Sequence, residues 1–212
     1  MTIKKFTFNP FQENTYIIYD DTKECVIIDP GCYYEYEKKE LKSFINQKKI
    51  IPKKLINTHC HIDHVFGNKF ITSNWNIPLL AHKKEEYTLE NNKFVSESYG
   101  FDNYEISPKI DQFLKCEDIV KFGKSQLNVI FTPGHSPGHI CLINKKDKII
   151  ISGDLIFKNS IGRTDLPGGN FETLMNSIKN KIINLEEEYQ IFSGHGENTT
   201  LKNEKKNNPF LN

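Results

Sequence analysis

The segment Thr58–His64 constrains the chain most, because T-H-C-H-I-D-H places three imidazoles and a carboxylate within six residues. It directly follows a short predicted β-strand. Side chains two residues apart on an extended segment point to the same side, so His59 and His61 can chelate one ion. Asp63 and His64 would follow in a turn and face a second ion. Imidazole and carboxylate ligands favour zinc, iron and manganese, so the segment predicts a metal centre.

Three further ligand-type residues occur in the same local setting, each in a turn that follows an apolar strand-like run. A glycine precedes or lies within each turn, and glycine lets the backbone turn tightly beside an ion. Loops at strand ends, backed by a rigid sheet, commonly carry functional groups. With the histidine-rich segment, these turns supply seven candidate metal ligands: His59, His61, Asp63, His64, His135, Asp154 and His195.

The order of predicted elements indicates an α/β or α+β protein folded as one domain over residues 1–212. We expect strands at Ile3–Phe8, Thr15–Tyr19, Cys25–Ile28, Lys54–Asn57, Pro78–Ala81, Leu127–Phe131, Ile140–Ile143, Lys148–Ile151 and Gln190–Phe192, the last strand of the chain. We expect helices at Tyr36–Ile45, at Asn68–Trp75 and from Phe171 to Leu185, with Asn170 as N-cap of the last. The segment Lys202–Asn208 is a polar tail.

Charge and cysteine content exclude several classes of protein. Lys and Arg number 28 against 27 Asp and Glu, so the net charge of +1 provides no basic field for nucleic acid. No stretch approaches 18 apolar residues, and the start has no apolar signal region. The five cysteines are scattered without a C-x-x-C pair, which favours reduced cytosolic thiols. We therefore expect a cytoplasmic protein with no nucleic-acid or membrane partner; the sequence predicts no particular oligomeric state.

Several motifs resemble those of the metallo-β-lactamase-fold hydrolases, and their order is similar to the glyoxalase II-like branch. Beyond the T-H-x-H-x-D-H element and the later His, Asp and His, the shared motifs are Asn9–Phe11, Thr132–Gly138, Gly153–Phe157, Gly162–Asp165 and the ending Asn208–Leu211. The ending resembles the short bacterial form of hydroxyacylglutathione hydrolase. The resemblance implies a four-layer αββα sandwich, the metallo-β-lactamase fold, with metals at one rim of the sheets.

The resemblance also implies how the ligands divide between two divalent metal ions, for which zinc is the first expectation and iron or manganese the alternatives. It places His59, His61 and His135 on the first ion, Asp63, His64 and His195 on the second, and Asp154 between them. The implied activity is hydrolysis of a small-molecule thioester such as S-lactoylglutathione by a metal-bound hydroxide. Asp63 is the candidate catalytic residue, because it could also orient that hydroxide.

Two alternatives belong to other functional classes. Persulfide dioxygenases share the fold and resemble this chain at Gly162–Asp165. They bind one iron through two histidines and an aspartate, here His59 or His61 with His135 and Asp154. A non-enzymatic metal-binding protein is the second alternative, but ligands that leave open coordination positions suit catalysis better than storage.

Residues near the candidate ligands have structural interpretations as well. Cys60 should point away from its histidine neighbours as a buried thiol, and His139 is most simply a turn residue. Arg163, the one arginine of the chain, either binds a substrate carboxylate or pairs with Asp165. In glutathione-specific glyoxalase II, a Lys and two Tyr contact glutathione. Arg163, Asp165 and Glu197 occupy those places here, which predicts weak binding of S-lactoylglutathione.

Overall fold

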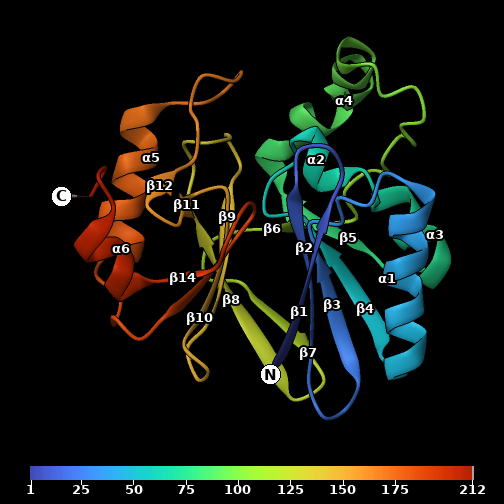
Figure 1. Cartoon of the computed structure of the whole chain (residues 1–212), viewed down its shortest axis with the longest axis horizontal. Coiled ribbons are helices and arrows are strands. Elements are labelled where there is room, and N and C mark those ends of the chain that lie inside the picture. The colour runs from blue at the N-terminus through green and yellow to red at the C-terminus, as the bar shows by residue number, and fades with distance from the viewer. Residues whose placement is uncertain (212) are drawn as a thin grey trace. The chain divides into compact units, whose positions relative to one another are not determined.

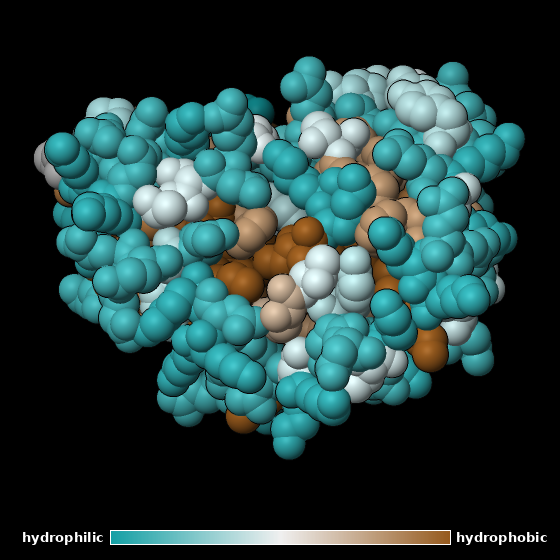
Figure 2. Space-filling model, turned by 60° about the horizontal axis from the view of Figure 1, so that its bottom comes forward, coloured by the Kyte–Doolittle hydropathy of each residue, from teal (hydrophilic) through white to brown (hydrophobic). Residues whose placement is uncertain are grey.

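The structure, a computed structural model, describes residues 1–211 and consists of two compact units (Figure 1). Unit 1 comprises Met1–Phe113 and Lys121–Ser125, and unit 2 comprises Leu114–Val120 and the described part of Gln126–Asn212. Each unit contains a β-sheet with helices packed beside it, which confirms the mixed α/β class. The single domain over residues 1–212 stays a prediction. Hydrophilic residues dominate the face drawn in Figure 2.

Unit 1 is built on the sheet β1-β2-β3-β4-β5-β6. Its strands are β1 (Thr2–Phe8), β2 (Glu13–Tyr19), β3 (Glu24–Ile28), β4 (Ile51–Ile56), β5 (Leu79–His82) and β6 (Gln112–Leu114). Its helices are α1 (Glu35–Lys48), α2 (Ile62–Val65), α3 (Asn68–Trp75), the 3-10 turn η1 (Lys83–Glu85) and α4 (Glu86–Tyr99). The predicted strands and helices of this half are all present, with ends that differ by a few residues.

One face of the unit 1 sheet is covered by helices α1 and α3, which lie along it in Figure 1. Leu41 and Ile45 of α1 and Ile71 of α3 are buried against strand residues such as Ile27 and Leu55. The removal of these large aliphatic side chains from water stabilises the sheet–helix pair, at about 1.5–3 kcal/mol for each fully buried side chain. The core therefore holds the strand ends rigidly.

Parallel pairing decides where the first ligand segment lies. Strands β3 and β4 are parallel, with Ile28 beside Ile56, so both chains leave the sheet at the same edge. The amide of Asp29 donates to the carbonyl of Ile56 at 3.0 Å. Residues 29–31 and residues 57–64 consequently run over one edge of the unit 1 sheet.

Unit 2 is built on the sheet β14-β13-β10-β9-β8-β7. Its strands are β7 (Ile119–Phe122), β8 (Ser125–Phe131), β9 (Ile140–Asn144), β10 (Ile149–Gly153), β13 (Gln190–Ser193) and β14 (Thr199–Thr200). A short hairpin, β11 (Ile156–Phe157) and β12 (Ser160–Ile161), lies beyond β10, and the helices are α5 (Phe171–Ser177), the π-helical turn η2 (Ile178–Ile182) and α6 (Leu201–Asn207). Leu174, Ile178 and Leu201 bury their side chains against Ile150 and Ile191.

Strand directions again bring the ligand turns to one edge. Strands β10 and β13 are parallel, and β9 is antiparallel to both β8 and β10, so β8 runs in the same direction as β10. The turns that follow β8, β10 and β13 therefore all leave the unit 2 sheet at the same edge. The amide of Gly194 donates to the carbonyl of Gly153 at 2.9 Å, which ties two of these turns together.

One prediction about the C-terminal region was wrong, and a helix there was not predicted. Gln190–Phe192 is not the last strand, because β14 pairs with β13 in antiparallel fashion. The polar tail forms helix α6. Thr200 is its N-cap and accepts from the amide of Asn203, and Leu201 and Glu204 are buried. Single buried positions within a polar segment give little periodic signal, so the sequence pattern did not indicate this helix.

The long helix predicted from Phe171 to Leu185 differs from the prediction in its second half. Asn170 is its N-cap, as predicted, and accepts from the amide of Thr173 at 2.8 Å. The α-helical part ends at Ser177 and continues as a π-helical turn to Ile182.

Among the described residues, no helix is long and apolar enough to cross a membrane.

Candidate metal centre

The histidine-rich segment of unit 1 forms a compact group of imidazoles at the edge of the sheet. The ring centroid of His59 lies 4.7 Å from that of His61 and 4.1 Å from that of His64. His59 and His64 are fully buried. Asp29, His59 and His64 each place one potential ligand atom within 4.8 Å of the others. Several nitrogen donors are thus directed toward a small volume.

Asp29 holds this segment from the neighbouring strand. Its carboxylate accepts from the amide of Thr58 at 2.7 Å and from the Thr58 hydroxyl at 2.6 Å. Asp29 Oδ2 also lies 3.2 Å from Nδ1 of His64. A carboxylate at one imidazole nitrogen fixes the ring and leaves the other nitrogen as the acceptor that a metal requires. Asp29 therefore places a carboxylate beside the His64 ring.

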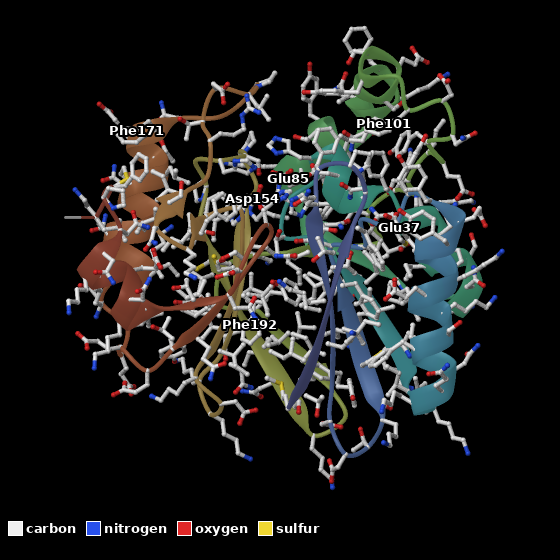
Figure 3. The ribbon with its side chains drawn as sticks, viewed as in Figure 1. Glu37, Glu85, Phe101, Asp154, Phe171 and Phe192 are labelled. Carbon is white, nitrogen blue, oxygen red and sulfur yellow. The ribbon has the colours of Figure 1, made fainter. Side chains whose placement is uncertain are left out.

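The peptide groups of Cys60 are fixed from the other side by the region around α4, and we call this arrangement the α4 clamp. The Cys60 amide donates to Glu85 Oε2 at 2.8 Å, and the Cys60 carbonyl accepts from Asn92 Nδ2 at 2.9 Å. Both clamp residues are buried; Glu85, labelled in Figure 3, is the last residue of η1 and the N-cap of α4. Because Cys60 lies between His59 and His61, the α4 clamp sets the separation of those two imidazoles.

The Cys60 side chain itself is buried, as predicted. Burial raises the pKa of the thiol well above its ordinary value. The thiolate is the reactive form of cysteine, so this side chain is chemically inert. Cys25, Cys32 and Cys141 are also buried free thiols, and Cys116 is exposed.

Asp63 and Glu13 complete the surroundings of His64. Asp63 Oδ2 lies 3.6 Å from His64 Nε2, and its side chain is 15 % exposed. The Asp63 carbonyl accepts from Asn9 Nδ2 at 3.0 Å, which connects the loop after β1 to the ligand segment. Glu13 is fully buried, and desolvation raises its pKa well above the ordinary value. Glu13 Oε1 is 3.9 Å from His64 Nδ1.

Unit 2 contributes a second group of ligand-type residues. Asp154 lies just past the end of β10 (Figure 3), and its Oδ2 is 3.5 Å from Nε2 of both His135 and His195. Asp154 is 6 % exposed, and the side chain of His195 is 27 % exposed. One carboxylate oxygen thus faces two imidazole nitrogens, and both kinds of group are ligands that divalent transition metals accept.

The segment after β12 packs closely against these ligands. Nδ1 of His135 is 2.8 Å from the carbonyl oxygen of Arg163, so a proton on Nδ1 leaves Nε2 as an acceptor. A Cβ atom on Gly162 would lie 1.9 Å from the Asp154 carbonyl oxygen. Glycine at position 162 is therefore required by the close approach of two backbone segments, and not by a positive φ.

The guanidinium of Arg163 forms a two-pronged ion pair with Asp165. Its Nε is 2.7 Å from Oδ1 and its Nη2 is 2.6 Å from Oδ2. These hydrogen bonds hold the pKa of Asp165 at about 2. The structural alternative for Arg163 is thus realised in this structure, and its role as a substrate contact stays a prediction. Glu197 similarly pairs with Lys158.

Sequence reasoning missed several residues that hold the ligands. Asp29 shares the pattern of the other ligand residues, since it directly follows an apolar strand, and that signal could have identified it. Glu85, Asn92 and His139 carry no such local signal. The interpretation of His139 as a simple turn residue was wrong, because it is fully buried and bonded to the Asp154 backbone.

The donor set of each unit fits a divalent transition metal. Unit 1 offers buried imidazoles with a carboxylate beside them, and unit 2 offers two imidazoles facing one carboxylate. Nitrogen and oxygen donors of this kind suit zinc, iron and manganese, and the carboxylate and carbonyl partners of His64 and His135 are typical of metal-bound histidines. The chemistry available to such a set is Lewis-acid activation of water and carbonyl groups.

Comparison with known proteins agrees with this chemistry. The model of the metallo-beta-lactamase superfamily matches residues 8–195. The hydroxyacylglutathione hydrolase GloC of Haemophilus influenzae is 34% identical over 219 residues, which cover 100% of this chain and 99% of that protein. The crystal structure of BLEG-1 B3 metallo-beta-lactamase has a TM-score of 0.91 at 35% identity, covering 99% of each chain. TTHA1623 in a di-iron-bound form has a TM-score of 0.87 at 32% identity, covering 98% of this chain and 100% of that one.

The chain therefore belongs to the metallo-beta-lactamase superfamily and has its mixed α/β fold. Within the superfamily it is a metal-binding hydrolase, similar to GloC over its whole length. The predicted fold class and the resemblance to metallo-β-lactamase-fold hydrolases are confirmed. The glyoxalase II-like specificity stays a prediction.

Proposed function

We propose that this protein hydrolyses small-molecule thioesters with the help of two divalent metal ions. The observation that carries the proposal is the gathering of ligand-type imidazoles and carboxylates at the strand ends of each unit. The likeness to GloC, a hydroxyacylglutathione hydrolase, supports a thioester as the substrate class. The likeness to BLEG-1, a B3 metallo-beta-lactamase, makes β-lactams the comparison substrate.

We propose the ligand division that the family resemblance implies. His59, His61 and His135 would hold one ion, and Asp63, His64 and His195 the other. Asp154 would bridge, which is supported by its equal distance of 3.5 Å from the Nε2 atoms of His135 and His195. Zinc is the ion we expect, and the di-iron form of TTHA1623 supports iron as the alternative.

The protein's own residues would prepare the reaction in three ways. Asp29, Glu85 and Asn92 keep the unit 1 imidazoles in place, so the binding site does not reorganise during the reaction. Asp63, partly exposed and beside His64, would accept a hydrogen bond from an attacking water and orient it. Divalent ions, when bound, polarise the substrate carbonyl and lower the pKa of water.

A thioester suits this arrangement because of its leaving group. A thiol has a pKa near 8.5, so a thiolate departs without a strong general acid. We assign the role of general acid to none of the described residues around Asp154. An amide or alkyl ester would require a proton donor for its more basic leaving group.

The substrate range depends on charges near the unit 2 ligands. The expected repulsion of glutathione carboxylates by Asp165 and Glu197 is weakened, because these side chains pair with Arg163 and Lys158. The phenol contacts of glutathione-specific enzymes are still missing at positions 165 and 197. We therefore propose weak binding of S-lactoylglutathione, seen as a high KM, and comparable turnover of other thioesters.

The test is a set of assays on one metal-loaded preparation. Thiol release from S-lactoylglutathione and from a second thioester should proceed in anaerobic buffer without oxygen uptake. Oxygen uptake with glutathione persulfide, in the absence of thioester turnover, would replace hydrolysis by the dioxygenase alternative. Turnover of a chromogenic β-lactam alone would assign the substrate class of BLEG-1. Metal binding without turnover of any of them would indicate a metal-binding protein.

The variant that tests the proposed ligand set removes the carboxylate of Asp154. Asp154→Ala should abolish thioester hydrolysis, because both imidazoles of unit 2 lose their common partner, while the circular dichroism spectrum stays that of the parent. Metal analysis of the purified variant should show reduced metal content. Full activity in Asp154→Ala would remove Asp154 from the ligand set.

A further inference from the structure

We propose that His139 is a positioning residue, which together with Thr132 and Cys141 locks the Asp154 turn through a closed ring of hydrogen bonds. The inference deepens the proposed function, since Asp154 is the proposed bridging ligand. His139 lies immediately before β9 and is fully buried. Its side chain is not placed among the proposed ligands, and its ring centroid is 6.1 Å from that of His135.

The first contact of His139 is with the backbone of the ligand residue. The amide of Asp154 donates to Nε2 of His139 at 3.1 Å. A nitrogen that accepts a hydrogen bond carries no proton, so in the neutral imidazole the proton is on Nδ1. His139 is therefore a donor at Nδ1, and this atom lies 2.9 Å from the hydroxyl oxygen of Thr132.

The remaining contacts continue in the same direction. Thr132 Oγ1, which accepts from His139, lies 3.4 Å from Cys141 Sγ and can donate its own hydrogen there. Cys141 Sγ in turn donates to the carbonyl oxygen of Ser152 at 3.6 Å. Ser152 precedes Asp154 by two residues, so the chain of donors returns to the turn where it began. Chains of hydrogen bonds with one direction polarise and strengthen one another.

The ring also connects two ligand turns. Thr132 begins the turn that carries His135, and its amide donates to the carbonyl of His139 at 2.9 Å. The pairing of β10 with β13 shifts register between Ile151 and Gly153, whose φ is +47°, so the ladder is irregular where the Asp154 turn begins. The hydrogen-bonded ring adds contacts at this point and fixes His135 and Asp154 relative to each other. Burial raises the pKa of the Cys141 thiol to about 12. The thiol therefore stays protonated and can donate to the Ser152 carbonyl.

The key variant is Thr132→Val, which keeps the shape of the side chain and removes the hydroxyl through which the ring passes. Thr132→Ser retains the hydroxyl and serves as the rescue. Thr199→Val is the matched control: Thr199 is also a buried threonine of unit 2, and its hydroxyl bonds to Glu204 Oε1 at 2.6 Å, away from the ligand turns. His139→Leu removes both hydrogen bonds of the imidazole, one to the Asp154 amide and one to the Thr132 hydroxyl.

The measurement is a titration of metal-free protein with Zn²⁺ or Co²⁺ against a competing chelator, combined with the melting temperature of the metal-free protein. We expect Thr132→Val and His139→Leu to weaken metal binding by roughly 10–100-fold, the effect typical of residues that orient ligands. Thr132→Ser should bind metal as the parent does. Thr199→Val should lower the melting temperature without weakening metal binding.

Two outcomes would overturn the proposal. Parental metal affinity in Thr132→Val would show that the ring does not position Asp154. An equal loss of affinity in Thr199→Val would assign the effect to general destabilisation. Should His139→Leu fail to fold, Thr132→Val and Thr132→Ser still decide the matter. The titration uses no substrate, so a protein that binds metal in this way but cleaves no thioester would refute only the proposed function.

Discussion

At the scale of single residues, the candidate site depends on partners outside the proposed ligand set. The carboxylate of Asp29, the carbonyl of Arg163 and the imidazole of His139 each contact a proposed ligand residue. Such partners fix the rotamer or tautomer of the ligand before any ion is bound, and this reduces the entropy lost on binding. Substitutions at these partners should therefore affect metal affinity more than the fold.

Gly162→Ala is expected to damage the unit 2 ligand group from the backbone side. The added Cβ would lie 1.9 Å from the Asp154 carbonyl oxygen and 3.3 Å from His135 Cβ. The segment must shift, which destabilises the protein by about 1–3 kcal/mol and displaces the Arg163 carbonyl from His135. Denaturant unfolding and metal analysis check both effects. Gly100→Ala is the control: its φ of +74° makes the substitution strained, but its Cβ would contact nothing, so it should lose stability and keep its metal. Parental metal content in Gly162→Ala would contradict the expectation.

Arg163→Ala separates the guanidinium from the backbone carbonyl. The carbonyl that holds His135 remains, so kcat for thioester hydrolysis should change less than KM, which should rise if the guanidinium is a uniform binding contact. Asp165→Asn should lower KM, because it releases Arg163 from the ion pair that holds the pKa of Asp165 at about 2. Steady-state kinetics with an anionic thioester measures both variants. A lower kcat with unchanged KM in Arg163→Ala would mean that the arginine supports the ligands and not the substrate.

At the scale of elements, parallel strand pairs determine where the functional turns lie. The pair β3 and β4 brings Asp29 beside Thr58, and the pair β10 and β13 brings Asp154 toward His195. Helix α4 adds a constraint from outside the sheet through the α4 clamp. Strand pairing and helix α4 thus set the positions of the turns. The turns carry the side chains that can bind metal.

Asn92→Ala tests the contribution of α4. Loss of the amide leaves the buried Cys60 carbonyl without this donor, which should destabilise the protein by about 1–3 kcal/mol. The separation of His59 and His61 should also loosen, so metal affinity should fall. Asn91→Ala is the matched control on the same helix, since Asn91 Nδ2 donates to the Tyr87 carbonyl within α4. Unfolding curves and metal titration compare the two; equal behaviour would show that the α4 clamp has no special role.

At the scale of the whole molecule, metal binding should stabilise the folded protein. An ion bound by the native state and not by the unfolded state shifts the folding equilibrium toward the native state. The fold itself has a large apolar core in each unit and should persist without metal.

Metal removal is the corresponding experiment. With free metal at 1,000 times its Kd, the native state should gain about 4.1 kcal/mol, and the melting temperature should rise accordingly. A chelator should reverse the rise without unfolding the protein. Asp154→Ala should show a smaller rise under the same conditions. Identical melting of the metal-free and metal-loaded parent would contradict metal binding by the native state.

The sequence predicted the ligand-type residues and most of the elements, because both depend on local patterns. His59 and His61 are two residues apart on an extended segment, and their rings lie 4.7 Å apart, so the local rule held. Apolar runs that end in turns marked β3, β8, β10 and β13 correctly. The rule failed for helix α6, where only Leu201 and Glu204 are buried within a polar segment.

The amino-acid sequence by itself thus determined the mixed α/β class, the family and the types of donor that are available. Only the tertiary structure decided which buried groups fix those donors. Asp29 and Thr58 are 29 residues apart, and His139 and Asp154 are 15 apart, yet each pair shares a hydrogen bond. Buried polar groups must find partners, and strand pairing selects them from distant parts of the chain. Local sequence patterns carry no information about that selection.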